Sequence, residues 1–285
     1  MTVKPGYQNL ISLSIAPVNI TVGKLYSDLM VSIELMKDIQ REYNLDGFEF
    51  QCLEEWDENR PPVDGRKARL DIWRGSRKYS IERIADLLKD AKLNILSVHA
   101  KRDIGIYLCS DNSSDIEKGK RLIHEALWFT GEIGSSVCVF HLWDTRKQDF
   151  DIEFLRKILT EISLEYPGVI ASVENVPTNL KGCTPYDLVK EFQWITLDLQ
   201  WAALYNELEK FVKIKDRIVN IHLRGELENS RWVVRNSTFE FYETLNMIRE
   251  SWNYKGILTM EPNGLKVGEF DELMSAMGTL KKHIE

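Results

Sequence analysis

The sequence has few cysteines, no long apolar run and fewer basic than acidic residues, and each shortage excludes a class of protein. The four cysteines among 285 residues are far apart, with no Cys-x-x-Cys pair, so we expect free thiols in a reducing compartment. No apolar stretch approaches the roughly 20 residues that span a bilayer, and residues 1–10 lack the apolar core of a signal peptide. A formal net charge of −7 argues against a nucleic-acid or anionic-membrane partner. Together these shortages predict a cytoplasmic protein that is soluble.

What the sequence does contain is a regular alternation of short apolar runs and amphipathic segments. A helix follows each of the expected strands, which lie at 9–16, 46–52, 94–99, 136–141, 168–177, 194–198, 217–222 and 256–261. Strict alternation predicts parallel strands with right-handed crossovers. Eight units in residues 1–285 fit a single-domain α/β protein, a (β/α)8 TIM barrel. The alternative, an open doubly wound sheet, usually has a glycine-rich loop after its first strand, and residues 12–20 contain none.

Two local features stand out between these units. Residues 53–79 carry Trp56, Trp73 and a Pro-Pro pair without a helix or strand pattern. A segment of this length suggests a lid loop over the barrel. Further on, Ser114 and Glu117 form a capping-box pattern, which predicts that a helix begins there.

Polar side chains lie at or near the ends of seven expected strands. They are Glu49, His99, His141, Glu174, Asp198, His222 and Glu261. The C-terminal strand ends of such a barrel meet at the face that carries function. A single histidine on an apolar run is more often a hydrogen-bonded core residue than a ligand, but buried carboxylates brought together repel one another unless something compensates their charge. One divalent ion with mixed oxygen and nitrogen ligands, such as Mn²⁺, Zn²⁺, Co²⁺, Fe²⁺ or Mg²⁺, is the simplest compensation.

The same strand ends resemble the xylose-isomerase-like barrel superfamily, in the branch of sugar phosphate isomerases, ketose 3-epimerases and inosose dehydratases, with endonuclease four more distant. The resemblance covers essentially the whole chain. Its motifs are DGFEF at 46–50, SVH at 97–99, SVEN at 172–175, TLD at 196–198, NIHLRGE at 220–226 and TMEP at 259–262.

This resemblance implies one metal held by Glu174, Asp198, His222 and Glu261, with the two glutamates also serving as the acid/base pair. The family often has Asp-x-x-His after the sixth strand, where the histidine contacts the substrate. Trp201 takes that histidine's position in this sequence.

The leading hypothesis is therefore a metal-dependent isomerase or epimerase acting on a small sugar or polyol in carbohydrate metabolism. Glu174 would remove a proton next to a carbonyl, the metal would stabilise the enediolate, and Glu261 would return a proton. The candidate substrate contacts are Glu49, His99, His141, Trp201 and Arg224. A salt bridge from Arg224 to Glu226 or to another acidic loop residue explains that arginine equally well. Trp56, Trp73, Trp143 and Trp201 would either stack on a sugar or pack a lid onto the barrel.

Other readings remain open. The replacement by Trp201 suits a barrel that has lost catalysis and only binds a small molecule. A DNA repair nuclease resembling endonuclease four would need a multi-metal cluster and a basic groove, but the later Asp-x-His pair is missing and the net charge is negative. A dehydratase acting on a cyclic polyol would use the same metal and proton abstraction. The sequence fixes neither the substrate, nor the metal, nor whether the chain forms a homo-oligomer.

Overall fold

The structure is a computed structural model that describes residues 9–52, 78–229, 231–234 and 239–284. All but two residues of the lid expected at 53–79 lie outside these ranges, and so do Trp56 and Trp73.

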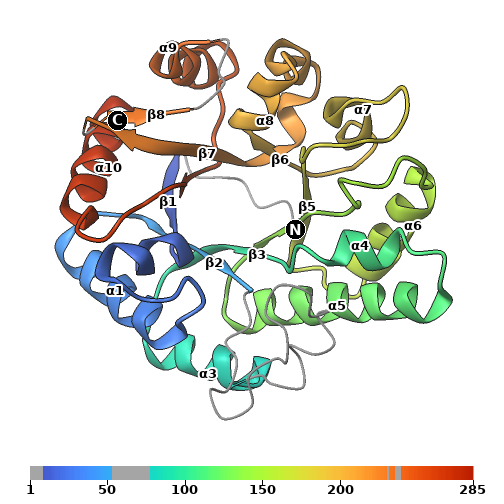
Figure 1. The fold of residues 1–285 in the computed structure, drawn as a ribbon, viewed down its shortest axis with the longest axis horizontal. Helices are drawn as coiled ribbons and strands as arrows, with labels where there is room; N and C mark the ends of the chain where they lie inside the picture. The colour runs from blue at the N-terminus through green and yellow to red at the C-terminus, as the bar shows by residue number, and fades with distance from the viewer. Residues whose placement is uncertain (1–8, 53–77, 230, 235–238, 285) are drawn as a thin grey trace.

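Eight parallel strands close into a barrel, with helices around its outside (Figure 1). In chain order they are β1 (Leu10–Ser14), β2 (Gly47–Gln51), β3 (Ile95–His99), β4 (Val137–Phe140), β5 (Ile170–Glu174), β6 (Ile195–Asp198), β7 (Ile218–Glu228) and β9 (Ile257–Pro262). Strand β9 pairs with both β1 and β7, and this closes the ring. The predicted (β/α)8 barrel is confirmed.

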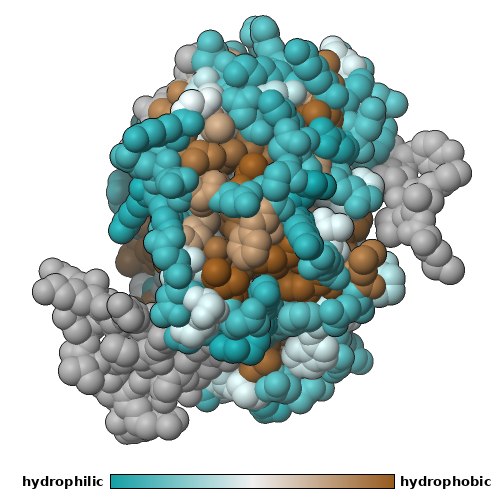
Figure 2. Space-filling view, turned by 90° about the vertical axis from the view of Figure 1, so that its right-hand side faces the viewer, coloured by the Kyte–Doolittle hydropathy of each residue, from teal (hydrophilic) through white to brown (hydrophobic). Residues whose placement is uncertain are grey.

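The surrounding helices follow the predicted order. They are η1 (Ala16–Val22), α1 (Leu29–Glu42), α3 (Ile81–Asp90), α4 (Ile104–Leu108), α5 (Ser113–Glu132), α6 (Ile152–Ser163), α7 (Pro185–Val189), α8 (Leu199–Leu204), η2 (Leu208–Arg217), α9 (Phe241–Asn246), η3 (Met247–Ser251) and α10 (Phe270–Ile284). On the side of the molecule that Figure 2 shows, hydrophilic residues cover much of the surface and hydrophobic ones gather near the centre. No helix in the described part of the chain is long and apolar enough to cross a membrane.

The capping-box prediction is wrong in its detail. Helix α5 begins at Ser113, and the side chain of Asn112 accepts a hydrogen bond from the Ser114 amide. Asparagine is among the best N-cap residues because its short side chain reaches the unpaired amides of the first turn. The cap therefore falls two residues before the serine that the pattern selects.

Strand β7 is longer than the sequence predicts. The strand expected at 217–222 continues to Glu228 and turns back into the antiparallel strand β8 (Arg231–Val233). The charged residues Glu226 and Glu228 hid this extension from the apolar pattern. As a result, Arg224 lies on a strand that is paired with β9 rather than on a loop.

The two faces of the barrel strands differ in chemistry. Side chains alternate along a strand, and the outward ones, such as Phe48, Val98 and Leu197, are fully buried in the main hydrophobic core. The inward side chains are mostly polar, and they too are buried. They include Ser12, Ser14, Glu49, Ser97, His99, Ser172, Glu174, Thr196, Asp198, Asn220, His222, Thr259 and Glu261. The barrel axis is thus a column of polar groups that must satisfy one another.

The four cysteines are free thiols, as predicted. Cys52, Cys109 and Cys138 are buried, whereas Cys183 is half-buried. Burial raises the pKa of the Cys109 thiol to about 11, despite an opposing hydrogen bond from the Asp144 amide.

Candidate active site

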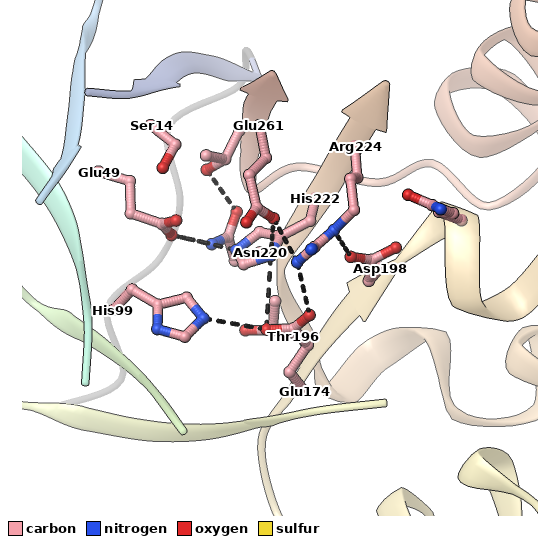
Figure 3. A network of polar contacts seen from close by, with 12 residues as sticks. Ser14, Glu49, His99, Glu174, Thr196, Asp198, Asn220, His222, Arg224 and Glu261 are labelled. Carbon is pink, nitrogen blue, oxygen red and sulfur yellow. Dashed lines mark hydrogen bonds and ion pairs between the residues drawn. The ribbon is translucent and has the colours of Figure 1, made fainter. Parts of the chain in front are cut away.

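The predicted strand-end residues meet inside the barrel at the C-terminal ends of the strands. Figure 3 shows Glu49, His99, Glu174, Asp198, His222, Arg224 and Glu261 converging from six strands. Strand register explains part of this convergence, because Asp198 lies opposite His222 across the β6–β7 pair. Arg224 likewise lies opposite Glu261 across β7 and β9.

Glu49 contacts one ring nitrogen of His222. The Nε2 of His222 lies 3.1 Å from Glu49 Oε2, and both side chains are completely buried. The other ring nitrogen, Nδ1, faces the opposite way, 3.3 Å from Glu261 Oε2 and 3.6 Å from Glu174 Oε2. Neither approach has hydrogen-bond geometry, so Nδ1 is a buried nitrogen without a hydrogen-bond partner in the described residues.

Glu49 is itself fixed by a chain of hydrogen bonds deeper in the barrel. Its Oε2 accepts from Ser97 Oγ at 2.9 Å and from Asn220 Nδ2 at 3.2 Å. Asn220 Oδ1 in turn accepts from Thr259 Oγ1 at 2.9 Å. This chain joins β2, β3, β7 and β9, and it fixes the ring of His222 in one orientation.

Arg224 lies between three carboxylates of the site. Its Nε donates to Asp198 Oδ2 at 2.7 Å, and one terminal nitrogen lies 2.7 Å from Glu261 Oε2. The same nitrogen donates to Glu174 Oε1 at 3.4 Å. The guanidinium also lies over the Trp201 ring, 5.3 Å from its centroid. Arg224 therefore forms salt bridges, but the partners that the structure shows are the carboxylates predicted to bind metal, not the loop acids that the salt-bridge interpretation named.

Asp198 ends β6 and starts α8. Its Oδ1 caps that helix by accepting from the Trp201 amide at 3.1 Å. Its backbone amide donates to Asn175 Oδ1, and Asn175 Nδ2 donates back to its carbonyl at 3.1 Å. The backbone of Asp198 is thus fixed by Asn175, which directly follows β5.

Two further histidines approach the other side of Glu174. His141 Nε2 lies 2.9 Å from Glu174 Oε2, and His99 Nε2 lies 3.2 Å from the same oxygen. The two rings meet edge to face with centroids 4.8 Å apart. His141 directly follows β4 rather than ending it. Both histidines join the predicted site, while their contact with a substrate remains a prediction.

The charges of the cluster perturb its pKa values strongly. Burial favours the neutral acids, but it is outweighed at Glu174, whose pKa the histidines His141 and His222 lower well below its usual value. It is outweighed at Glu261 as well, where Arg224 and His222 lower the pKa to about 2. At Asp198 burial prevails over the opposing charge of Arg224 and raises the pKa to about 7.

The pKa values of His141 and His222 shift in opposite directions. Burial lowers the pKa of His141 to about 4, even though Glu174 opposes the shift. Burial also disfavours the charged form of His222, but the charges of Glu49 and Glu174 outweigh it and raise the pKa of His222 well above its usual value. The surrounding acids therefore favour the positively charged form of His222.

The donor set fits a divalent cation. Glu174, Asp198 and His222 offer ligand atoms within 4.8 Å of one another, and Glu261 Oε2 lies beside the unpartnered Nδ1 of His222. A ligand histidine usually has its other nitrogen fixed by a carboxylate, which is the arrangement of Glu49. Hard oxygen donors with one imidazole suit the ions that the sequence suggested. His99, His141 and Glu174 form a second group of ligand atoms within the same distance.

The candidate tryptophans Trp143 and Trp201 differ in their exposure. Trp143 is 1% exposed and donates from Nε1 to the Pro177 carbonyl at 3.0 Å, so it packs inside the protein. Trp201 is half-buried and faces Arg224. Of the candidate tryptophans in the described residues, it is the one whose contact with a substrate stays a prediction.

Two residues near the site were missed from the sequence. Arg102 lies 3.8 Å from Glu261 Oε1 with its side chain 54% exposed. Tyr26 donates to Gln51 Oε1 at 2.9 Å, and its pKa is raised by burial and then by the charge of Glu261. Neither follows a strand in a recognisable motif. The only feature of the sequence that pointed to Arg102 was its position three residues after His99.

Comparison with known proteins supports the architecture. No family model and no curated protein matches the chain. Among solved structures, a D-tagatose 3-epimerase-like protein is 18% identical, with 97% of each chain covered and a TM-score of 0.60. The two chains share a TIM-barrel fold. An L-ribulose 3-epimerase (14% identity, 97% of this chain and 94% of that chain, TM-score 0.65) and a xylose isomerase domain protein from Planctomyces limnophilus (14%, 98% and 97%, 0.57) share it. The resemblance is confirmed at the level of the fold.

Proposed function

We propose that the chain is a metal-dependent isomerase or epimerase of a small sugar or polyol. The observation that carries this proposal is the convergence of Glu174, Asp198, His222 and Glu261 at one end of the barrel, with the Nδ1 of His222 free toward the two glutamates. The shared fold with ketose 3-epimerases supports the same class of substrate.

The four converging residues would hold the metal. A bound divalent ion would polarise the substrate carbonyl and offset the negative charge that develops on it. The hydrogen bond between Glu49 and His222 keeps the imidazole turned toward this position. We therefore assign Glu49 a positioning role, and its predicted contact with the substrate stays untested.

The two glutamates suit proton transfer on opposite faces of one carbon. In Figure 3 Glu174 and Glu261 lie on opposite sides of the His222 and Arg224 side chains. Glu174 would remove the proton, and Glu261 would return one from the other side, which inverts the centre. His99 and His141 contact the Oε2 of Glu174 and would orient this carboxylate.

Exchange of substrate hydrogen with solvent tests the proposal. The protein would be loaded with Mn²⁺ or Co²⁺ and incubated in D₂O with a panel of ketoses, inososes and sugar phosphates, and deuterium incorporation next to the carbonyl would be followed. Glu174→Gln should reduce exchange at least about a hundredfold on any substrate found. Glu117→Gln, on the exposed side of α5, is the matched control and should leave exchange unchanged. Full exchange in Glu174→Gln would refute the assignment.

A second candidate is a small-molecule binding protein without turnover. Arg224 favours it, because its guanidinium already pairs with Asp198 and Glu261. Trp201 favours it too, because it replaces a histidine that contacts substrate in the resembled family. Saturable binding of a sugar, with neither deuterium exchange nor product in the presence of metal, would select this candidate over the enzyme.

A further inference from the structure

Arg224 contacts the same three carboxylates that the metal site requires. The distances are 2.7 Å to Asp198, 2.7 Å to Glu261 and 3.4 Å to Glu174. All three acids are at most 2% exposed, and the arginine side chain is 9% exposed. A guanidinium so enclosed by acids carries the positive charge that offsets theirs.

The carboxylate oxygens of Asp198 and Glu261 that an incoming ion would bind already have other contacts. Oδ1 of Asp198 already accepts from the Trp201 amide, and Oδ2 accepts from Arg224 Nε. Oε2 of Glu261 is the atom beside the unpartnered Nδ1 of His222, and it is also the atom nearest to Arg224. A divalent cation at this point would meet both the competing hydrogen bonds and the repulsion of a like charge.

The backbone holds Arg224 firmly in this place. Strand β7 pairs with β9 through Arg224 and Gly225, and with β8 just beyond. A side chain at Gly225 would come within 2.7 Å of the Trp232 ring, so the strand is packed tightly there. The Trp201 ring covers the guanidinium on another side. Because the backbone is fixed, only the side chain of Arg224 can move out of the cluster.

We propose that Arg224 is a built-in counter-cation that competes with the divalent ion, so that metal binds only when the guanidinium leaves Asp198 and Glu261. The inference rests on the metal site of the proposed function. It predicts that the wild-type protein binds metal more weakly than its ligands alone would allow. It also predicts that metal binding moves Arg224 away from Trp201.

The first test is calorimetric titration of the metal-free protein with Mn²⁺ and with Zn²⁺. Arg224→Gln should raise the affinity roughly tenfold or more, equivalent to ~1.4 kcal/mol. Arg224→Lys keeps the charge but cannot pair with two acids through one planar group, and it should give an intermediate value. Arg102→Gln is the matched control: it removes one positive charge 3.8 Å from Glu261 but makes no contact with Asp198, and it should change affinity less than about threefold.

The second measurement follows metal binding in the wild-type protein and needs no variant of Arg224. Zn²⁺ should change the tryptophan emission as the guanidinium leaves the Trp201 ring, and Trp201→Phe should abolish that part of the change. Equal metal affinity in wild type and Arg224→Gln, both folded, would overturn the inference and leave the proposed function standing. Absence of metal binding in every variant would overturn both.

Discussion

The positioning role of Glu49 gives the sharpest single prediction. Glu49→Gln keeps the size of the side chain and an oxygen that can accept from Ser97, Asn220 and His222. The unpartnered Oε1 of Glu49 leaves a side of the carboxylate on which the new amide group displaces no donor. We therefore expect the variant to fold and to lose chiefly the negative charge beside His222.

The size of the effect follows from the hydrogen bonds. A bond to a charged partner contributes ~1.5–3 kcal/mol and a neutral one ~0.5–1.5 kcal/mol. Losing the charge thus weakens the fixation of the ring by about 1–1.5 kcal/mol, and about 1.4 kcal/mol is a factor of ten. Loss of such a carboxylate behind a ligand histidine typically lowers metal affinity by roughly 10–100-fold. We expect the lower half of that range.

Calorimetric titration with Mn²⁺ and the metal-induced rise in Tm measure this effect. Glu117→Gln, which removes an exposed carboxylate on α5, is the control and should behave as wild type. If wild type binds the ion and Glu49→Gln binds it within about twofold of wild type, the contact between Glu49 and His222 does not orient a ligand. The positioning role would then be wrong.

Two further predictions concern stability and thiol chemistry. Gly105→Ala should lower the free energy of unfolding in urea by about 1–3 kcal/mol, because its Cβ would lie 2.5 Å from backbone atoms of Trp143. Gly168→Ala is the control and should unfold near the wild-type midpoint, because its Cβ would meet nothing within 4 Å. Equal midpoints for the two variants would refute the packing argument. Titration of the native protein with Ellman's reagent should show one fast thiol, Cys183, and slow reaction of the three buried ones until the chain unfolds. Fast reaction of two or more thiols would contradict the burial.

The strand ends could be predicted because local sequence defines them. An apolar run that ends in Glu174, Asp198 or Glu261 predicts both the strand and the candidate site residue at its end, and strand alternation then directs that side chain inward. The fold of the eight strands followed from the same pattern. Local composition was enough to predict these features because they do not depend on which residues contact one another in the fold.

The partners themselves could not be predicted. Arg224 is long and flexible, and which acids it pairs with depends on the register of β7 with β6 and β9. The extension of β7 was hidden because its charged residues lie beyond the barrel. Glu49 and His222 are far apart in the chain, and no local signal says that they touch. These relations arise from tertiary structure alone.

The chain of hydrogen bonds from Thr259 through Asn220 and Glu49 to His222 has a consequence for how the sequence can change. Each member has a partner on another strand, so replacing one member by an apolar residue leaves its neighbour unsatisfied. Thr259→Val would leave Asn220 Oδ1 without its donor, two links below the imidazole. Substitutions at the base of the barrel are thus transmitted to its mouth, and these four positions should be inherited together or replaced together.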